Sequence, residues 1–465
     1  MTAKIKFLGG VRTVTGSSHL VSTDKSEVLL DAGLFQGRRD ESYLLNTSFS
    51  FNPRKLNAVV LSHAHVDHCG NIPSLIKRGM RCKVYTTSAT RDLAKLMLAD
   101  SGKIQEEDIR YVNKINRRLG LPPRKPLYTQ KEATRATKIF RALSYGQRFC
   151  ITKDMFVTLY DAGHILGSSI VVLDIRSRDS QRSIRVGYAV DLGRKNLPLI
   201  GDPIVPAALD YLILESTYGG RTHDNIEDAK NKLRDVINRT VERRGKIIIP
   251  AFSLERTQEV IYFLNALVKE KAIPAIPIYV DSPLAIDITE LFMHHVAYLN
   301  SKTQEAILNE QSPFEFINLK YLREQEESKK LNEDKRAMII IAGSGMCESG
   351  RVLHHLKNNI EDSRNTVLVV GFMARDTLGR KIIEKSPIVR IFGVEHELNA
   401  EVVVINAFSC HADKNELRDF VSECLPLKRI FLVHGEEEQS QILADTLSET
   451  GLDVYIPHKD EEVEL

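Results

Sequence analysis

A run of histidine and aspartate residues follows a short apolar segment, with a spacing that suits metal binding. The run is Ser62-His63-Ala64-His65-Val66-Asp67-His68, directly after Ala58-Val59-Val60-Leu61. Neutral imidazole and carboxylate are ligands that suit zinc, and a catalytic zinc keeps one coordination position open for water. His63 and His65, one residue apart, can reach one metal from an extended loop, whereas Asp67 and His68 point towards a second.

Other residues of metal-binding type also stand where apolar, β-branched runs end. These are Asp31 after 28–30, His164 after 155–160, Asp191 after 185–190, Glu215 after 211–214 and His434 after 429–433. Because sites in α/β proteins gather beyond the carboxyl ends of strands, we expect these side chains to meet in one crevice. A surface run of histidines is the alternative explanation of the cluster, and these further strand ends make it the weaker one.

A second stretch, residues 246–405, has a different pattern. It contains the continuous apolar runs 246–249, 276–280, 338–341, 366–370 and 401–405, with helical segments such as 255–271 between them. Continuous rather than alternating apolar runs favour a parallel sheet that is covered on both faces. A chain of 465 residues is also too long for one ordinary core, so more than one domain is expected.

Composition excludes several classes of protein. The six cysteines are scattered without a Cys-x-x-Cys pair, which argues against a disulfide framework or a zinc ribbon. No apolar run approaches the ~20 residues of a membrane span, and the first residues, MTAKIKFLGG, lack the layout of a signal peptide. We therefore expect a cytoplasmic protein. The net charge of +3 gives by itself no case for nucleic acid.

Positive charge is nevertheless concentrated in one segment between the histidine cluster and His164. Residues 110–148 contain eleven basic side chains against a single acid, Glu132, a net +10. One interpretation is a solvated helical hairpin with scattered basic residues. The other is a surface that contacts phosphates and steers a nucleic acid towards the metal site.

The cluster and the residues around it resemble the metallo-β-lactamase superfamily. His63-Ala64-His65-Val66-Asp67-His68 matches its His-x-His-x-Asp-His motif, and Asp31, His164 and Asp191 match its flanking motifs in order. The resemblance implies a first zinc on His63, His65 and His164, and a second on Asp67 and His68, with Asp191 bridging the two. Asp31 would orient a ligand or the water instead of binding metal.

Three later motifs resemble the β-CASP nucleases, a group that includes the endonuclease subunit of the messenger-RNA 3′-end cleavage complex. They are Glu215-Ser216-Thr217-Tyr218-Gly219, Phe408-Ser409-Cys410-His411-Ala412-Asp413 and Leu432-Val433-His434-Gly435-Glu436. The resemblance implies an α/β fold, a metallo-β-lactamase αββα sandwich with an α/β β-CASP cap inserted between Glu215 and His411. We expect the sandwich to comprise residues 1–208 and 396–465, and the cap residues 209–395.

The same resemblance implies a ribonuclease with two zinc ions. His411 would be the general acid, Glu215 would hold its ring, Asp67 would also take part in catalysis, and His434 would complete the second zinc site. RNA-processing members carry histidine at the third motif, whereas Artemis-type DNA-repair members typically carry valine. We therefore expect RNA, in single-stranded form, as the partner and no membrane, and leave a homodimer and endonuclease or 5′-exonuclease action open.

Three alternatives share parts of this pattern. A lactamase, thioesterase or glyoxalase would share the zinc site but would not need a cap over residues 209–395. A DNA nuclease would share nearly everything except the preference tied to His434. A non-catalytic scaffold would have lost metal ligands, whereas every expected ligand is present in this chain.

A glycine-rich turn is a candidate phosphate site in the second stretch. Ile341-Ala342-Gly343-Ser344-Gly345-Met346 follows an apolar run and precedes the helix-like segment 350–358. Backbone amides at such a turn can hold a phosphate, although a plain tight turn has the same sequence. Together with the similar segment of the β-CASP family, the turn predicts phosphate binding by Ser344, Gly345 and Arg351.

Overall fold

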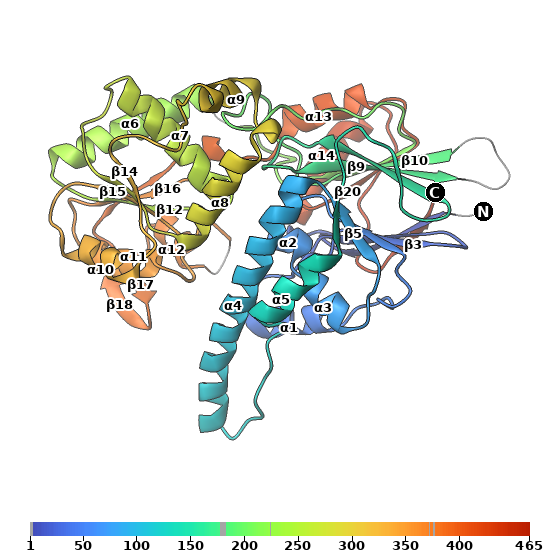
Figure 1. Ribbon diagram of the computed structural model, residues 1–465, viewed down its shortest axis with the longest axis horizontal. Helices are drawn as coiled ribbons and strands as arrows, with labels where there is room; N and C mark the ends of the chain where they lie inside the picture. The colour runs from blue at the N-terminus through green and yellow to red at the C-terminus, as the bar shows by residue number, and fades with distance from the viewer. Residues whose placement is uncertain (1–2, 177–182, 224, 372, 375–376) are drawn as a thin grey trace. The chain divides into compact units, whose positions relative to one another are not determined.

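The apolar runs of the sequence form three large sheets of seven, seven and six strands and one two-stranded hairpin (Figure 1). The computed structural model describes residues 3–176, 183–223, 225–371, 373–374 and 377–465. Within them the chain divides into two units. Unit 1 contains residues 1–196, 201–222 and 410–465, and unit 2 contains residues 197–200 and 223–409.

Unit 1 is built on the two seven-stranded sheets. The first has the order β22-β1-β2-β3-β4-β5-β6 and the second the order β21-β20-β11-β10-β9-β8-β7. The strands of the first sheet are β1 (Lys4–Gly9), β2 (Ser18–Ser22), β3 (Glu27–Leu30), β4 (Ala58–Val60), β5 (Lys83–Thr86), β6 (Phe140–Ala142) and β22 (Glu462–Glu464). Those of the second are β7 (Phe149–Cys150), β8 (Met155–Asp161), β9 (Ser169–Arg176), β10 (Ser183–Ala189), β11 (Tyr211–Glu215), β20 (Arg429–Val433) and β21 (Val454–Tyr455).

The core of unit 1 lies between these sheets. Val28, Leu30 and Val60 of the first sheet pack in one buried cluster with Leu159 and Val171 of the second. A separate apolar cluster joins the other face of the second sheet to α13 (Lys414–Glu423) and α14 (Glu437–Ser448). The first sheet carries the helices α1 (Arg39–Thr47), α2 (Val66–Cys69), α3 (Ile72–Lys77), α4 (Ser88–Arg118) and α5 (Gln130–Ala136). This is the expected αββα sandwich, which is confirmed.

Unit 2 contains the continuous apolar runs of the second stretch. All of its large-sheet pairings are parallel, in the order β14-β13-β15-β12-β16-β19. The strands are β12 (Ile247–Pro250), β13 (Ile278–Val280), β14 (Leu319–Tyr321), β15 (Ile339–Ala342), β16 (Thr366–Val369) and β19 (Glu401–Val404). The expectation of a parallel sheet is therefore correct, and β14 is an edge strand that the sequence pattern did not indicate.

Helices alternate with these strands, as parallel pairing requires. They are α6 (Ile226–Glu242), α7 (Arg256–Lys269), α8 (Pro283–His294), α9 (Ser301–Leu308), α10 (Gln325–Glu333), α11 (Val352–Asn359) and α12 (Leu378–Ile383). A separate hairpin is formed by β17 (Ile388–Ile391) and β18 (Val394–Glu397). Among the described residues, no helix combines the length and the apolar character that crossing a bilayer requires.

The observed boundaries of the two units differ from those expected at 208/209 and 395/396. They fall at 222/223 and 409/410, and a short segment, 197–200, also belongs to unit 2. The physical reason is strand pairing. β11 pairs in parallel with β10 and β20 of unit 1, and β19 pairs in parallel with β16 of unit 2.

Candidate metal centre and catalytic residues

A change of backbone conformation divides the histidine cluster into two groups. β4 is a buried central strand, and the chain continues in extended form to His65, whose φ and ψ are −61° and 147°. In extended chain, alternate side chains share a side, so His63 and His65 point together. α2 then begins at Val66, and this helical turn carries Asp67 and His68 to a different position.

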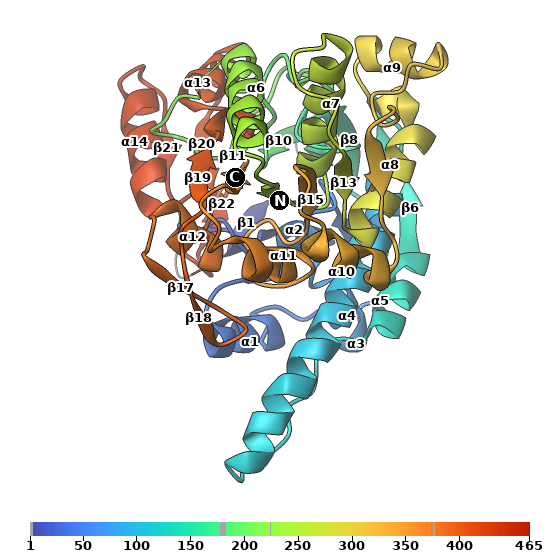
Figure 2. The ribbon, with the colours of Figure 1, turned by 90° about the vertical axis from the view of Figure 1, so that its left-hand side faces the viewer.

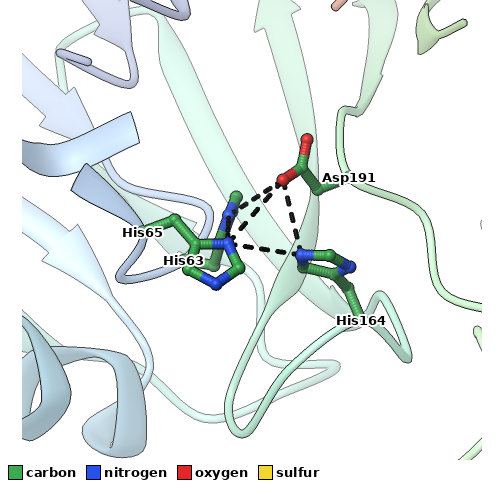
Figure 3. A group of neighbouring side chains, drawn as sticks. All are labelled: His63, His65, His164 and Asp191. Carbon is green, nitrogen blue, oxygen red and sulfur yellow. Dashed lines mark hydrogen bonds and ion pairs between the residues drawn. The ribbon is translucent and has the colours of Figure 1, made fainter. Parts of the chain in front are cut away.

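The first group brings together His63, His65, His164 and Asp191 (Figure 3). His63 Nε2 lies 3.1 Å from His65 Nδ1 and 3.1 Å from Asp191 Oδ2. His164 Nε2 lies 3.4 Å from His65 Nδ1 and 3.4 Å from Asp191 Oδ2. Tetrahedral ligands around a zinc ion at 2.0–2.1 Å are separated by about 3.3 Å, so these four atoms fit such an ion.

The second group contains Asp67, His68 and His434. His68 Nε2 lies 3.3 Å from His434 Nε2 and 3.9 Å from Asp67 Oδ2, and His434 Nε2 lies 3.6 Å from Asp67 Oδ2. The other carboxylate oxygen of Asp191, Oδ1, faces this group, at 3.4 Å from His68 Nε2. Asp191 thus presents one oxygen to each group.

Buried charge is the second reason to assign a metal here. Asp191 is 2% exposed, and its Oδ1 has no hydrogen-bond partner within the described part of the chain. A buried carboxylate oxygen needs a cation or a donor, because its desolvation is otherwise costly. Burial lowers the pKa of His63 to about 4 and lowers that of His164 as well, so both rings are neutral, the form that binds metal.

Three residues of the site hold unusual backbone conformations within two positions after their strands. Asp31, Asp191 and His434 have φ values of 55°, 58° and 48°, in the left-handed region that non-glycine residues rarely adopt. Such strain is characteristic of functional sites, where the surrounding structure maintains it. Here it turns the chain at the end of β3, β10 and β20.

Close packing of loops explains one glycine of the motifs. A Cβ on Gly193 would lie 1.8 Å from the carbonyl oxygen of Gly163, so only glycine lets the Asp191 loop approach the His164 loop this closely. Val190, which directly precedes Asp191, is buried in the core between the sheets.

Asp31 lies behind the second group and contacts one of its ligands. Asp31 Oδ2 accepts a hydrogen bond of 2.7 Å from His68 Nδ1. The same carboxylate accepts bonds from the backbone N–H and the hydroxyl of Ser62, and from the hydroxyl of Tyr188. Ser62 and Tyr188 were not identified from the sequence. Ser62 directly precedes the cluster, which is a usable signal, whereas Tyr188 has none.

Glu215 and His411 form a pair next to the first group. His411 Nδ1 lies 3.1 Å from Glu215 Oε2, and its ring centre lies 4.7 Å from that of His164. Glu215 is fully buried at the end of β11, and it also accepts a hydrogen bond from the backbone of Leu192. Burial would lower the pKa of His411, but the charge of Glu215 outweighs it and raises the pKa to about 9.

The segment of His411 is fixed by backbone contacts with the Asp191 loop. Ala412 N donates to Leu192 O at 2.7 Å, and Arg194 N donates to Cys410 O at 3.2 Å. Asp413, in the same motif, caps α13 by accepting from the backbone of Asn415 and Glu416. The motif therefore combines a candidate proton donor with the start of a helix.

The predicted phosphate residues lie in unit 2, where the turn 343–345 follows β15 and leads into α11. The Ser344 hydroxyl accepts from Glu348 N at 3.1 Å, and a Cβ on Gly345 would lie 2.7 Å from the ring of Phe252. Arg351 is placed differently from the expectation. Its guanidinium donates to Asp281 Oδ1 at 2.6 Å and to the carbonyl oxygens of residues 322 and 323.

Three family descriptions match successive parts of the chain. A metallo-β-lactamase superfamily domain matches residues 20–194, a Beta-Casp domain residues 257–382, and a Zn-dependent metallo-hydrolase RNA specificity domain residues 395–457. A crystal structure of a protein of unknown function from Enterococcus faecalis aligns over the whole of both chains, with a TM-score of 0.55 and 14% identity. That likeness concerns the fold alone.

Curated relatives match over nearly the full chain. Ribonuclease TTHA0252 of Thermus thermophilus is 34% identical over 448 residues, which is 96% of each chain. Probable RNase MJ4 of Methanocaldococcus jannaschii is 31% identical, over 99% of this chain and 100% of its own. Transcription termination factor FttA of the same organism is 30% identical, over 96% of this chain and 68% of its own. The chain belongs to the β-CASP family of the metallo-β-lactamase superfamily, and its histidine and aspartate cluster is a metal-binding site.

Proposed function

We propose that this protein is a zinc-dependent ribonuclease that hydrolyses RNA phosphodiester bonds at a dinuclear site. The observation that carries the proposal is Asp191, whose Oδ2 faces one group of ligands and whose Oδ1 faces the other. RNA as the substrate is supported by the ribonuclease names of two relatives and by the RNA specificity domain at residues 395–457.

We assign the first zinc to His63, His65 and His164 and the second to Asp67, His68 and His434, with Asp191 shared. Two bound zinc ions would supply Lewis-acid activation of the attacking water and neutralise charge on the phosphate. Asp31 fixes the ring of His68 through its Nδ1, so that Nε2 faces the second group.

Three partly exposed side chains mark the side from which substrate reaches the centre. His65, Asp67 and His411 have 27%, 23% and 22% of their side chains exposed, whereas the remaining proposed metal ligands are buried. We assign to Asp67, the partly exposed carboxylate, the role of taking the proton of the attacking water.

The proton for the leaving oxygen comes from His411. Glu215 holds the ring through Nδ1 and raises its pKa to about 9, so the imidazolium is the main form at neutral pH. A buried carboxylate behind a histidine orients the ring and stabilises its charged form, which is the arrangement a general acid needs.

The turn after β15 is the proposed site for a further phosphate of the RNA. The hydroxyl of Ser344 and the backbone at Gly345 would contact that phosphate. Two more hydroxyls, of Ser253 and Ser282, lie 3.2 Å apart beside Gly343 and extend this polar edge. Arg351 positions the turn through Asp281 and adds positive charge at the start of α11.

The test is cleavage of end-labelled single-stranded RNA, duplex RNA and DNA of matched sequence by the intact protein. We expect cleavage of single-stranded RNA that a chelator abolishes and added zinc restores, with elemental analysis giving two metal equivalents. The Asp191→Ala variant controls for a contaminating nuclease. Labelled products distinguish internal cuts from stepwise removal at the 5′ end. Cleavage of DNA at the rate of RNA, or of neither, would overturn the proposal.

A further inference from the structure

The second half of α4 forms an arm that projects from unit 1. α4 has 31 residues, and in both views its end extends beyond α1, α3 and α5 (Figure 1, Figure 2). We call residues 104–128, which are this end and the segment that returns from it, the α4 arm. The arm contains part of the basic stretch 110–148.

Side-chain hydrogen bonds brace the return segment against the helix. Asn113 Nδ2 donates to the carbonyl oxygen of Arg124 at 2.9 Å, and Arg124 N donates back to Asn113 Oδ1 at 2.7 Å. Asn116 Nδ2 donates to the carbonyl oxygen of Pro122 at 3.1 Å. At the base of the arm, the hydroxyl of the buried Tyr128 lies 2.9 Å from Ser101 Oγ. These hydrogen bonds hold the arm in one conformation, so its surface is defined.

Five of the six basic residues of the arm are exposed, and Arg124 is partly buried. Residues 110–125 contain six of them and no acid. Arg124 pairs with Asp40 at 2.6 Å. The other five form no ion pair with any residue in the described ranges: Arg110, Lys114, Arg117, Arg118 and Lys125. By contrast, Arg148, further along the basic stretch, is committed to Asp174 and the ring of Phe156. The five unpaired cations of the arm lie within 16 residues of one another in the sequence.

An apolar stripe adjoins the basic one. Tyr111, Ile115 and Leu119 follow a four-residue spacing and are 60%, 36% and 65% exposed. Successive residues of a helix are turned by 100° about its axis. The apolar stripe therefore lies beside the row formed by Arg110 and Lys114, on the side towards the buried Val112. An exposed aromatic ring beside a row of cations is the combination with which proteins hold single-stranded nucleic acid.

We propose that the α4 arm is a second RNA-binding surface, which grips single-stranded RNA outside the metal centre. Phosphates would lie along Arg110, Lys114, Arg117 and Arg118, and Tyr111 would stack on a base. The inference rests on the proposed ribonuclease function. It commits to RNA because residues 110–125 of the arm have six cations and no acid, the arm's acids (Glu106, Glu107 and Asp108) all preceding Arg110. The same unit also carries the proposed hydrolytic site.

The length of α4 determines how long an RNA must be to contact both the arm and the metal centre. Thr87, which caps the start of α4, donates through its hydroxyl to Gly167 O at 2.7 Å, in the loop that carries His164. Arg118 lies 31 residues further along, a helical rise of about 46 Å. A stacked strand rises about 3.4 Å per nucleotide, so RNA must exceed about 13 nucleotides to reach both.

The experiment compares two charge-neutralised variants of the full chain on RNA of two lengths. One variant combines Arg110→Gln, Lys114→Gln, Arg117→Gln and Arg118→Gln. The matched control removes the same charge elsewhere on unit 1 with Lys25→Gln, Lys55→Gln, Lys83→Gln and Lys153→Gln, all exposed residues. The RNAs have about 30 and about 6 nucleotides, above and below the required span.

We expect the arm variant to bind the long RNA more weakly. Its slope of log affinity against log salt concentration should fall by about 2.8, which is about 0.7 for each of the four lost contacts. Affinity for the short RNA, its cleavage rate and the metal content should stay as in the parent. Tyr111→Ala should weaken binding of the long RNA at least about fivefold, whereas Tyr111→Phe keeps the ring and the affinity.

Three outcomes would overturn the proposal. The arm variant could bind the long RNA with unchanged affinity and salt slope. It could lose affinity for the long and the short RNA equally. The control variant could lose as much affinity for the long RNA as the arm variant does. If parent protein cleaves neither RNA, the ribonuclease function fails, which is a separate result. Should the fourfold variant not fold, Arg117→Gln with Arg118→Gln gives the same test with half the change in slope.

Discussion

Asp31 Oδ2 lies 2.7 Å from His68 Nδ1, and both side chains are fully buried. The bond leaves His68 Nε2 as the atom that faces Asp191 Oδ1 at 3.4 Å. Asp31 also accepts from Ser62, which follows β4, and from Tyr188 of β10, so its own position is fixed from two segments of the chain. The orientation of one proposed metal ligand, His68, therefore depends on Asp31.

The first prediction is that Asp31→Ala weakens metal binding at the second position. Loss of such a partner typically costs 10- to 100-fold in metal affinity or activity, because the ligand ring is no longer held in one orientation. Zinc titration of the purified protein measures the effect, with the first position expected to change less. Tyr188→Phe is the control, since it removes one hydrogen bond to Asp31 but keeps the bond to His68. Equal metal affinity in Asp31→Ala and the parent would contradict the role.

The second prediction separates the two metal positions. His65→Ala should empty mainly the first, because His65 Nδ1 contacts only that group, and should lose most activity. Asp191→Ala should damage both positions at once, because its two oxygens face different groups. Elemental analysis of carefully loaded protein distinguishes the two variants by their metal content. If His65→Ala lost both metal equivalents, or if Asp191→Ala lost only one, the result would refute a carboxylate shared by the two positions.

The third prediction concerns the pair of His411 and Glu215. His411→Ala should keep its metal but lose cleavage by about 100- to 10,000-fold, the usual contribution of general acid–base catalysis. Glu215→Gln should act in the same direction, because the ring of His411 loses the carboxylate that holds it at 3.1 Å. Single-turnover cleavage rates at saturating RNA measure the effect on the chemical step. A His411→Ala variant that cleaves at the parent rate would remove this residue from the mechanism.

Much of the metal centre could be predicted because its ligands follow strand ends, which is a local pattern. His63, His164 and His434 each follow an apolar run within a few residues. The topology of the sheets then brings the ends of these strands together. The αββα fold could be inferred for the same reason, together with the family motifs. Their roles in binding and catalysis stay predictions until the variants above are measured.

What the sequence did not reveal depends on tertiary contacts. Arg351 follows a glycine-rich turn and has the charge for phosphate, yet its guanidinium points to Asp281, about 70 positions away in the chain. His355 is buried, with its Nε2 at 2.6 Å from the same Asp281. Side-chain directions of this kind are set by packing between elements that are remote in sequence, and no local pattern records them.

The last prediction concerns this buried network of unit 2. Asp281 is fully buried and accepts hydrogen bonds from Arg351, His355 and Ser328. Asp281→Ala would leave Arg351 and His355 without their partner, and breaking a buried pair in this way should cost about 3 kcal/mol of unfolding free energy. Urea unfolding of the intact chain at neutral pH, followed by a signal from unit 2, measures the difference from the parent.

The pH dependence of that difference follows from the pKa of Asp281. Burial alone would raise it, but the hydrogen bonds from His355, Ser328 and Arg351 lower it below its usual value in the folded chain. The stabilisation is therefore complete above the unfolded-state pKa of about 3.9, and it is lost as the pH falls through the folded-state pKa. The gap between parent and Asp281→Ala should accordingly be constant near neutrality and shrink in acid. A gap that widens as the pH falls below about 4 would mean that Asp281 is not held as a carboxylate by its three donors.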